Sequence, residues 1–253
     1  MTNEILIFIP TYNERDNVEK IITEILSLNI LNSDLLFIDD NSTDGTGEIL
    51  DRISKEKSNL YVIHRSGKLG VGSAHKDGIA YAYKNNYNIL ITMDADFTHS
   101  PSYILNLIKK SNTYDIVVTS RYIEKKSLED WNLFRKTLTL FGHFLTKYVL
   151  GLQYDASGAF RLYNINNINE KAFEKVISNG YSFFFESLFI LNFNKYKIFE
   201  IPIILTARTY GSSKMKFSDA FTSLKFLFKI FTKKIFNPSE FLISNYGKSH
   251  KEN

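Results

Sequence analysis

The sequence contains no cysteine in its 253 residues. This absence excludes disulfide bonds, thiolate metal sites and cysteine nucleophiles, and it is compatible with a reducing compartment. Long hydrophobic runs are also missing: no stretch of about 18 uncharged apolar residues is present, so no transmembrane helix is expected. The nearest approach, Ala220–Phe236, is interrupted by four lysines. The apolar run Ile5–Ile9 is short and lacks a basic flank, so no signal peptide is expected.

Neither sign of charge dominates the composition. The chain has 31 Lys and Arg against 27 Asp and Glu, for a formal net charge of +4. So small an excess gives no indication of a nucleic-acid partner, and none is expected. At 44% hydrophobic and 23% charged residues, the composition is that of a globular protein. The length suits one large α/β domain, or one medium domain with an appendage.

The first half of the chain alternates short apolar runs with helical patterns. Such runs, bounded by polar turns, are typical of buried strands. The runs are Ile5–Ile9, Leu35–Ile38, Leu60–Ile63, Ile89–Met93 and Ile116–Thr119. The helical pattern after the first run has Asn13 as its expected N-cap and Asp16 at its third position. The alternation predicts an α/β fold with a mainly parallel sheet and helices on both faces.

After Trp131 this alternation stops. The pattern there predicts helices over 133–150, 170–178 and 183–194, a strand over 199–205 and a helix over 217–235.

Polar clusters directly follow four of the predicted strands, at Pro10–Glu14, Asp39–Gly45, Asp94–Asp96 and Ser120–Tyr122. In open α/β sheets the ligand lies outside the carboxyl ends of the strands. The placement of these clusters, together with their residue types, predicts one binding site at this edge of the sheet.

Asp94-Ala95-Asp96 places two carboxylates where a strand opens into a loop, and such a pair can hold a divalent ion that also binds a diphosphate. An isolated pair of this kind is more often a solvated turn, but the strongly apolar strand before it favours the metal site.

Two other clusters have two interpretations each. The short side chains of Asp39–Gly45 either cap the helix that starts near Thr46 or accept hydrogen bonds from a nucleoside. Pro10–Glu14 forms either a tight turn under a helix or a loop that stacks on and binds a base.

The glycines and cations give weaker indications. Lys68–Gly72 contains G-x-G, but no third glycine follows at the spacing of a dinucleotide fingerprint, which disfavours a nicotinamide dehydrogenase. The Gly/Ser segment Arg208–Lys214 carries two cations that can close over a diphosphate, with solvated surface as the alternative. None of the five histidines has metal-ligand spacing, although His99 lies close to the Asp pair.

The segment from Lys214 to Ile235 is basic and aromatic. It holds six lysines and one acidic residue, and its apolar residues recur at helical spacing: Phe217, Phe221, Leu224, Phe228 and Phe231. This pattern predicts an amphipathic helix. Two interpretations stay open: a core-facing helix with a solvated face, or a helix that lies on an anionic membrane surface.

Together these motifs resemble the family 2 glycosyltransferases of the GT-A fold, and among them the dolichyl-phosphate (polyprenyl-phosphate) mannosyltransferases. Six sequence blocks carry the resemblance, and they occur in the order and at the spacing of that family. They are PTYNER at Pro10–Arg15, DDNSTDGT at Asp39–Thr46, MDADFTHSP at Met93–Pro101, SRY at Ser120–Tyr122, SGAFRLY at Ser157–Tyr163 and EIPIILTARTYGSSK at Glu200–Lys214. The resemblance implies a Rossmann-like GT-A catalytic domain over residues 1–215 and a basic amphipathic C-terminal segment over residues 216–253.

The resemblance also implies roles for matching positions. The residues that would hold the nucleoside are Pro10, Tyr12, Glu14, Ile38 and Asp40. Those that would contact the diphosphate and a Mg²⁺ or Mn²⁺ cofactor are Asp94, Ala95 and Asp96, with Asp94 and Asp96 as the metal site and Asp96 as the direct ligand. Arg208 and Lys214 would lie on a loop that covers the donor. The acceptor phosphate would be held by Arg121, Arg135 and Thr139, with Arg121 also near the donor. The implied catalytic residues are Asp96, Arg121 and Arg135. Thr98 departs from the Gln or Ser that related sequences can carry near the metal.

The implied activity is metal-dependent, inverting transfer of a sugar, expected to be mannose from GDP-mannose, onto a polyprenyl or dolichyl phosphate. A lipid phosphate is largely ionised at neutral pH and needs little help from a general base. Other donors such as UDP-glucose, or a surface-glycan acceptor, are the alternatives. A non-catalytic nucleotide-sugar-binding subunit is disfavoured because both Asp94 and Asp96 are present.

The expected location follows from the lipid acceptor. The chain would be cytoplasmic and peripheral on the cytosolic face of a membrane. Because no transmembrane helix is expected, attachment would come from the basic tail or from a membrane-anchoring partner protein.

Overall fold

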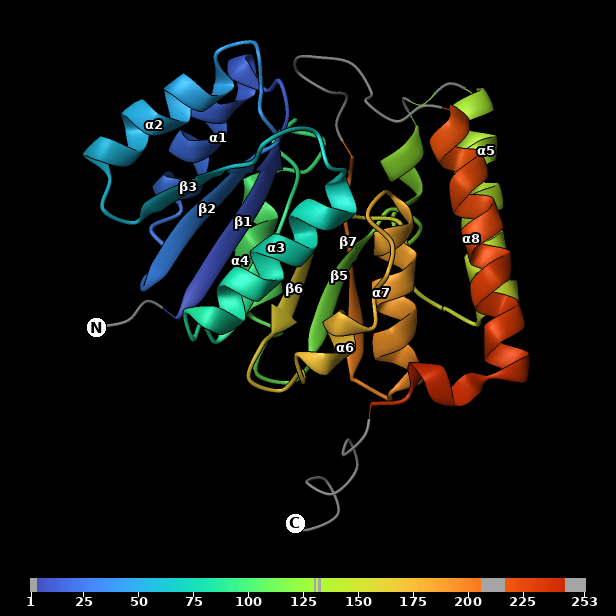
Figure 1. The fold of residues 1–253 in the computed structure, drawn as a ribbon. Helices are drawn as coiled ribbons and strands as arrows, with labels where there is room; N and C mark the ends of the chain where they lie inside the picture. The colour runs from blue at the N-terminus through green and yellow to red at the C-terminus, as the bar shows by residue number, and fades with distance from the viewer. Residues whose placement is uncertain (1–3, 130, 132, 206–216, 244–253) are drawn as a thin grey trace.

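The computed structural model describes residues 4–129, 131, 133–205 and 217–243. Within them the chain forms a seven-stranded sheet with the strand order β3-β2-β1-β4-β6-β5-β7 (Figure 1). The strands are β1 (Ile5–Thr11), β2 (Ser33–Asp39), β3 (Leu60–His64), β4 (Ile89–Thr92), β5 (Ile116–Ser120), β6 (Arg161–Asn164) and β7 (Ile198–Pro202). Every strand that the sequence predicts is present and overlaps its predicted range.

The sheet is parallel except at β6. β1 pairs in parallel with β2 and β4, β2 with β3, and β5 with β7, whereas β6 runs antiparallel to both β4 and β5. The prediction of a mainly parallel sheet is therefore confirmed. The sequence does not predict β6, because its four residues contain no apolar run.

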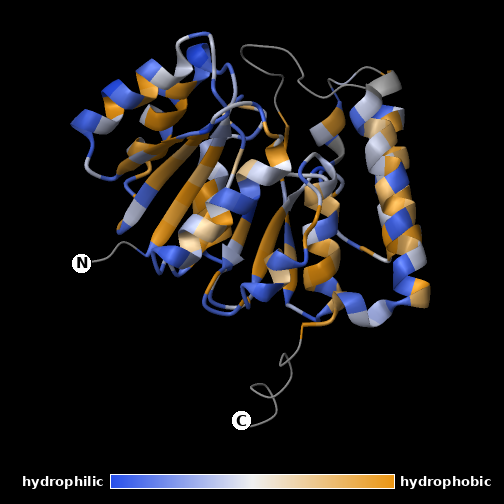
Figure 2. Cartoon of the chain, viewed as in Figure 1, coloured by the Kyte–Doolittle hydropathy of each residue, from blue (hydrophilic) through white to orange (hydrophobic). Residues whose placement is uncertain are grey.

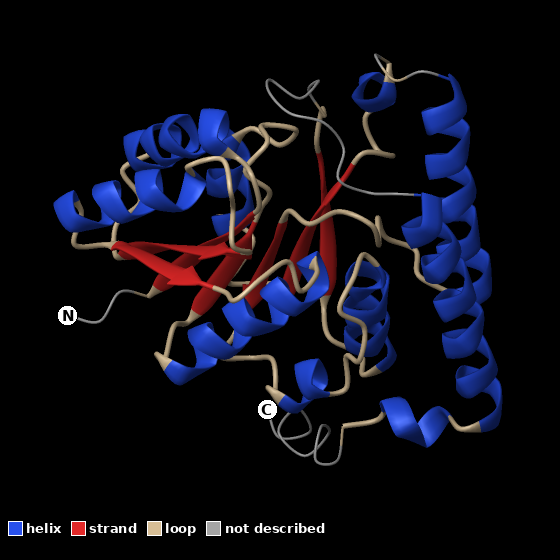
Figure 3. Cartoon of the chain, turned by 45° about the horizontal axis from the view of Figure 1, so that its top comes forward, coloured by secondary structure: helices blue, strands red, loops and turns tan. Residues whose placement is uncertain are grey.

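Helices cover both faces of the sheet (Figures 1 and 3). α1 (Arg15–Ser27), α2 (Thr46–Glu56) and α4 (Ile104–Ile108) share one buried apolar cluster with one side of the strands. α3 (Val71–Lys84), α6 (Lys171–Glu174) and α7 (Ser182–Phe193) share the cluster on the other side. Residues 182–191 of α7 are all buried, as expected for a helix with packing partners all round. The 3₁₀ turns are η1 (Pro101–Tyr103), η2 (Lys125–Leu128) and η4 (Pro238–Phe241).

Two further helices lie beside each other at the β7 end of the molecule (Figures 1 and 3). α5 (Leu133–Leu145) continues into a π-helical turn, η3 (Thr146–Leu150), and α8 (Phe217–Phe236) contacts both η3 and α7. Hydrophobic and hydrophilic residues are interleaved along α8 (Figure 2). In the part of the chain that the structure describes, no helix is both long and apolar enough to cross a membrane.

α3 lies unusually close to β1 at Gly78. A Cβ atom added to Gly78 would be 2.8 Å from Cγ of Phe8, and one added to Gly72 would be 2.6 Å from the carbonyl oxygen of Gly180. These two glycines let α3 pack against the sheet and against the start of α7. Both helix starts contribute to the pocket described below.

We expect Gly78→Ala to destabilise the fold by about 1–3 kcal/mol, because overpacking against Phe8 outweighs the better helix propensity of alanine. Urea unfolding measures the change. Gly67→Ala is the matched control, since a Cβ there would meet nothing within 4 Å, and it should change stability by less than about 0.5 kcal/mol. Equal stability of the two variants would contradict the close approach.

Candidate active site

The loops that follow the parallel strands enclose a large pocket at the carboxyl edge of the sheet. Its volume is about 940 Å³. Its walls include many of the predicted site residues: Pro10, Tyr12, Glu14, Asp40, Asp94, Ala95, Asp96, Arg121 and Thr139. The structure thus brings together residues that the sequence places after β1, β2, β4 and β5 and within α5.

The other predicted residues have different positions. Ile38 is fully buried in the apolar cluster shared with α3 and α7. Arg135 belongs to the first turn of α5, but its side chain is outside the described part. Arg208 and Lys214 lie outside the described residues altogether.

The loops after β1 and β2 are tied to each other. The backbone N–H of Asn13 donates to Ser42 Oγ (2.8 Å), and Asn13 Oδ1 accepts from the N–H of Thr43 (2.9 Å). Asn13 has a left-handed backbone with φ of 54°. The prediction of Asn13 as an N-cap is therefore wrong: Glu14 holds that position without a side-chain bond, because the Asn13 side chain joins the two loops instead.

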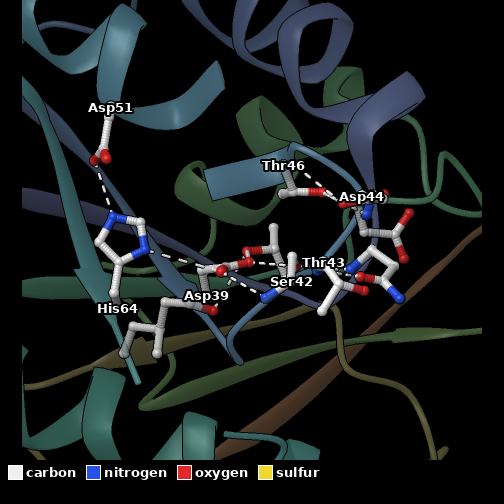
Figure 4. A network of polar contacts seen from close by, with 11 residues as sticks. Asp39, Ser42, Thr43, Asp44, Thr46, Asp51 and His64 are labelled. Atoms are coloured by element: carbon white, nitrogen blue, oxygen red, sulfur yellow. Dashed lines mark hydrogen bonds and ion pairs between the residues drawn. The ribbon is translucent and has the colours of Figure 1, made fainter. Parts of the chain in front are cut away.

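Two carboxylates of the Asp39–Gly45 cluster support the loop, and a third lines the pocket. Asp39 is buried and accepts from the N–H of Ser42 (2.9 Å), while Asp44 accepts from the N–H of Thr46 (3.0 Å) at the start of α2 (Figure 4). These two carboxylates support the loop, whereas the N-cap position of α2 itself is Gly45, without a side-chain cap. Asp40 lines the pocket. It is therefore the carboxylate of this cluster that is placed to accept hydrogen bonds from a nucleoside, which was the other interpretation of the motif.

His64, at the end of β3, extends this support outward. Its Nε2 lies 2.9 Å from Asp51 Oδ1, and its Nδ1 lies 3.8 Å from Asp39 Oδ2 (Figure 4). The hydrogen bond with Asp51 raises the pKa of His64 above its ordinary value. The sequence gives no signal for this contact, because Asp51 and His64 belong to different elements without a shared motif.

Arg65 holds the Asp40 carboxylate in place. Arg65 Nη1 donates to Asp40 Oδ1 (2.6 Å), and Arg65 Nε lies 3.3 Å from Asp77. Burial raises the pKa of Asp40, and the nearby Arg65 charge only partly offsets this effect. Lys68 and Tyr12 also line the pocket, and the ammonium of Lys68 lies 4.2 Å from the ring centre of Tyr12. Sequence reasoning missed Arg65 because it stands alone after β3.

The Asp pair follows β4 into the pocket. Asp96 Oδ1 accepts from the N–H (3.1 Å) and the hydroxyl (2.7 Å) of Thr98, so the residue that departs from the related sequences orients this carboxylate. His99 is buried beside it, and burial, assisted by Arg121, lowers the pKa of His99 to about 4.

The residues present fit a hard divalent cation. Asp94 and Asp96 offer carboxylate oxygens, which Mg²⁺ and Mn²⁺ prefer, and such ions commonly complete their shell with substrate phosphates and water. Among the described residues, no group of three or more His, Cys, Asp or Glu side chains is arranged around one metal position. A site of two carboxylates matches an ion shared with a phosphate ligand.

Arg121 follows β5 and is fixed by a buried carboxylate. Its Nε donates to Asp155 Oδ2 (2.7 Å) and its backbone N–H to the same oxygen (3.3 Å). Asp155 is 1% exposed, and its own N–H donates to Glu200. The two Nη groups make no hydrogen bond with a described residue, and Nη2 lies 3.4 Å from where a Cβ on Gly158 would be. The guanidinium of Arg121 is therefore oriented through its Nε, and its Nη groups are left without a hydrogen bond to a described residue.

Asp155 and Glu200 were missed as site residues. Asp155 precedes β6, the unpredicted strand, and Glu200 lies on β7 at the start of a recognised motif. Their signal in the sequence is their position: Asp155 stands two residues before the SGAFRLY block, and Glu200 is the first residue of the EIPIILTARTYGSSK block.

Two helices give the pocket an apolar wall. α5 contributes Leu138, Phe141 and Leu145, and α8 contributes Phe221, Leu224 and Leu227. One cavity thus joins carboxylates and an oriented arginine to an apolar wall formed by two helices.

The fold and this site define the class of protein. The family model "Glycosyl transferase family 2" matches residues 6–170. The chain therefore belongs to glycosyltransferase family 2, and the resemblance seen in the motifs is confirmed.

Two relatives match most of the chain. An undecaprenyl-phosphate mannosyltransferase from Micrococcus luteus is 31% identical over 212 residues, which cover 83% of this chain and 87% of that protein. A polyprenol monophosphomannose synthase from Mycolicibacterium smegmatis is 29% identical over 221 residues, which cover 86% of this chain and 83% of that protein.

Solved structures are similar in fold. Glucosyl-3-phosphoglycerate synthase from Mycobacterium tuberculosis in complex with uridine diphosphate aligns with a TM-score of 0.63 at 17% identity, covering 91% of this chain and 80% of that one. The same enzyme with Mn²⁺, UDP-glucose and phosphoglyceric acid aligns with a TM-score of 0.61 at 18% identity, again covering 91% and 80%. This likeness shows a shared GT-A fold.

The Arg121–Asp155 pair gives a pH-dependent prediction. Burial alone would raise the pKa of Asp155, but the Arg121 charge and three hydrogen bonds hold it below its ordinary value. The pair therefore stabilises the fold above the ordinary aspartate pKa, and this contribution is lost as the pH falls through the lowered value. We expect Asp155→Asn to lower the free energy of unfolding by about 3–5 kcal/mol at pH 7, because Arg121 is left unpaired. The difference from wild type should shrink below about pH 4.

Urea unfolding at a series of pH values from 7 down to 3 measures this. Glu19→Gln removes an exposed ion pair with Arg52 and, as the control, should cost less than about 1 kcal/mol at any pH. A destabilisation by Asp155→Asn that does not change with pH would show that the ion pair is not its cause.

Proposed function

We propose that this chain is a metal-dependent, inverting glycosyltransferase that transfers mannose from GDP-mannose to a polyprenyl phosphate. The observation that carries the proposal is the composition of the pocket. A diphosphate donor needs the carboxylates and cations at the strand ends, and a lipid phosphate needs an apolar wall next to an anion-binding group. The names of the two relatives, an undecaprenyl-phosphate mannosyltransferase and a polyprenol monophosphomannose synthase, support the same acceptor and sugar.

The donor would occupy the strand-end half of the pocket. Pro10, Tyr12 and Glu14 would contact the nucleoside from one loop, with Ile38 in the strand beneath. The Asp40 carboxylate, fixed by Arg65, is an acceptor for the ring N–H and amino group of guanine. Asp94, Ala95 and Asp96 would lie against the diphosphate, and Arg208 and Lys214 would cover it.

Asp94 and Asp96 would hold the cofactor, Mg²⁺ or Mn²⁺. When bound there, such an ion neutralises negative charge that grows on the departing diphosphate. Thr98 would keep the Asp96 carboxylate in its orientation throughout.

The acceptor phosphate would lie between the donor and the helix pair. The Nη groups of Arg121 would bind two phosphate oxygens in the bidentate manner typical of arginine, with Arg135 and Thr139 completing the grip from α5. Held there, the phosphate oxygen attacks the anomeric carbon in line with the departing diphosphate, which inverts that carbon. The phosphate is already anionic at neutral pH, so no general base has to remove a proton.

The lipid chain would leave the pocket along the apolar wall. Large apolar side chains of the same helices are exposed to solvent, including Phe141 and Phe144 on α5, Tyr148 on η3, and Phe221 and Phe228 on α8. Lysines alternate with these residues on α8. This arrangement supports peripheral binding at an anionic membrane surface, for which we propose the cytosolic face; a membrane-anchoring partner protein is the alternative source of attachment.

Product analysis tests the function. The full chain is incubated with a short polyprenyl phosphate and each of GDP-mannose, GDP-glucose, UDP-glucose and UDP-N-acetylglucosamine, with Mg²⁺ or Mn²⁺. We expect β-linked mannosyl phospholipid from GDP-mannose, and a reduction of about 100-fold or more in Asp96→Asn. Asp16→Asn, on the exposed face of α1, is the control and should keep full activity. A product from a UDP-sugar alone would overturn the donor assignment, and an unaffected Asp96→Asn enzyme would overturn the metal site.

The membrane contact makes a separate prediction. Lys225 and Lys229 are exposed on α8, whereas Lys233 pairs with Glu240 and Lys234 donates to the carbonyl of Leu150. We expect Lys225→Gln with Lys229→Gln to weaken binding to anionic vesicles by about 1 kcal/mol per lysine. Transfer to a short, soluble acceptor should be nearly unchanged.

Vesicle co-sedimentation measures this binding. The matched control exchanges Lys55 and Lys57, which lie at the end of α2 on the far side of the molecule from α8 (Figure 1). Equal loss in both double variants would indicate a general charge effect, and no loss in either would favour α8 as a packed helix with a solvated face.

A further inference from the structure

Arg161 is a buried cation that the proposed mechanism does not use. It opens β6, is 1% exposed, and leads the fully buried side chains in volume. Its Nη2 donates to the carbonyl of Ala156 (3.0 Å), and its Nη1 makes long bonds to the hydroxyls of Tyr163 (3.4 Å) and Ser187 (3.3 Å). Its Nε has no hydrogen-bond partner among the described residues. All of these neighbours are uncharged.

The other buried arginines of the site are neutralised. Arg65 lies 2.6 Å from a carboxylate oxygen of Asp40, and Arg121 lies 2.7 Å from one of Asp155. Arg161 forms no ion pair with any described carboxylate. A buried charge without a partner costs several kcal/mol, and an apolar side chain of similar length could fill the same space.

His75 is a titratable neighbour of Arg161, but it does not neutralise the arginine's charge. His75 is 1% exposed, and burial, together with the Arg161 charge, lowers its pKa to about 3. It is therefore neutral, and within the described part of the chain neither ring nitrogen has a hydrogen-bond partner. Its ring lies among those of Phe8, Phe183 and Phe184.

The guanidinium of Arg161 lies directly behind the pocket wall. Ala156, whose carbonyl it binds, lines the pocket, and so does Phe184, whose ring centre is 5.7 Å from the guanidinium carbon. Along the sheet, Arg161 is paired with Thr92 of β4 and Val118 of β5. Those two strands continue into Asp94 and Arg121. The guanidinium of Arg161 therefore lies behind residues that form the pocket wall, and the substrates' phosphates would lie on the other side of that wall.

We propose that Arg161 is a positioning residue that acts through the pocket wall: its unpaired charge favours phosphate groups bound in front of it, and its bond to Ala156 fixes that wall. This inference rests on the proposed function only in requiring a phosphate-bearing substrate. A unit charge across a few ångströms of poorly polarisable protein attracts an anion strongly, because solvent screens it little.

The test compares a charged with an uncharged ligand. GDP binding is measured by titration calorimetry, and guanosine binding is measured by ligand-observed NMR. If the wild-type protein binds UDP instead of GDP, UDP and uridine are used. An error in the proposed donor base therefore does not affect the outcome. We expect Arg161→Met to weaken nucleoside diphosphate binding about tenfold and nucleoside binding less than about twofold. Its melting temperature should be unchanged or higher, because an unpaired buried charge is replaced by an apolar chain. Arg161→Lys, which retains the charge, should keep most of the preference for the diphosphate.

His75→Phe is the control for packing. It alters the same buried cluster without changing its charge, and it should leave the ratio of the two affinities as in wild type. The proposal is overturned if Arg161→Met weakens both ligands equally or neither, or if it lowers the melting temperature or fails to fold. Any of these results would make Arg161 a structural residue.

Discussion

Six parallel strands end at one edge of the sheet, and the site depends on the charges that this edge can hold. Buried carboxylates stay ionised only where a cation or hydrogen-bond donor is close. The structure meets this condition twice with long-range ion pairs, Asp40 with Arg65 and Asp155 with Arg121. Arg65 orients Asp40 in the pocket, and Asp155 orients Arg121 there. The same contacts that make burial tolerable therefore also fix the groups that would meet a substrate.

The antiparallel strand β6 has a geometric consequence for this edge. Because β6 runs opposite to its neighbours, its first residue lies where theirs end. The segment 155–160, which precedes it, is thereby brought to the pocket, where Ala156, Ser157, Gly158 and Ala159 form part of the wall. Thr92 and Thr119 hold this segment by donating to the carbonyls of Ala159 (2.6 Å) and Phe160 (3.0 Å). An all-parallel sheet would place the segment at the opposite edge.

The sequence predicts those parts that depend on local pattern. The parallel strands follow from apolar runs, and the pocket's location follows from polar clusters at the strand ends. What sequence reasoning misses are partners that meet only in space, such as Arg65, Asp155 and Glu200, and the short strand β6, whose residues carry no apolar run. The wrong N-cap at Asn13 has the same origin: a tertiary contact with the next loop competes with, and replaces, the local bond. Local propensity describes a residue's neighbours in sequence, and each of these residues is placed by a neighbour in the fold.

The C-terminal helix α8 packs against the core with one side and exposes aromatic rings with another. Leu227 and Ile230 are buried in the core cluster, as for a packed helix. Phe221, Phe228 and Phe236 are 59%, 47% and 77% exposed, on a helix that also lines the pocket. Single exposed apolar residues are ordinary, but several large ones along one helix are typical of an interaction surface. A helix of this kind has the arrangement that the proposed membrane contact requires, because its rigid packing would fix the distance between the pocket and any rings inserted in the lipid.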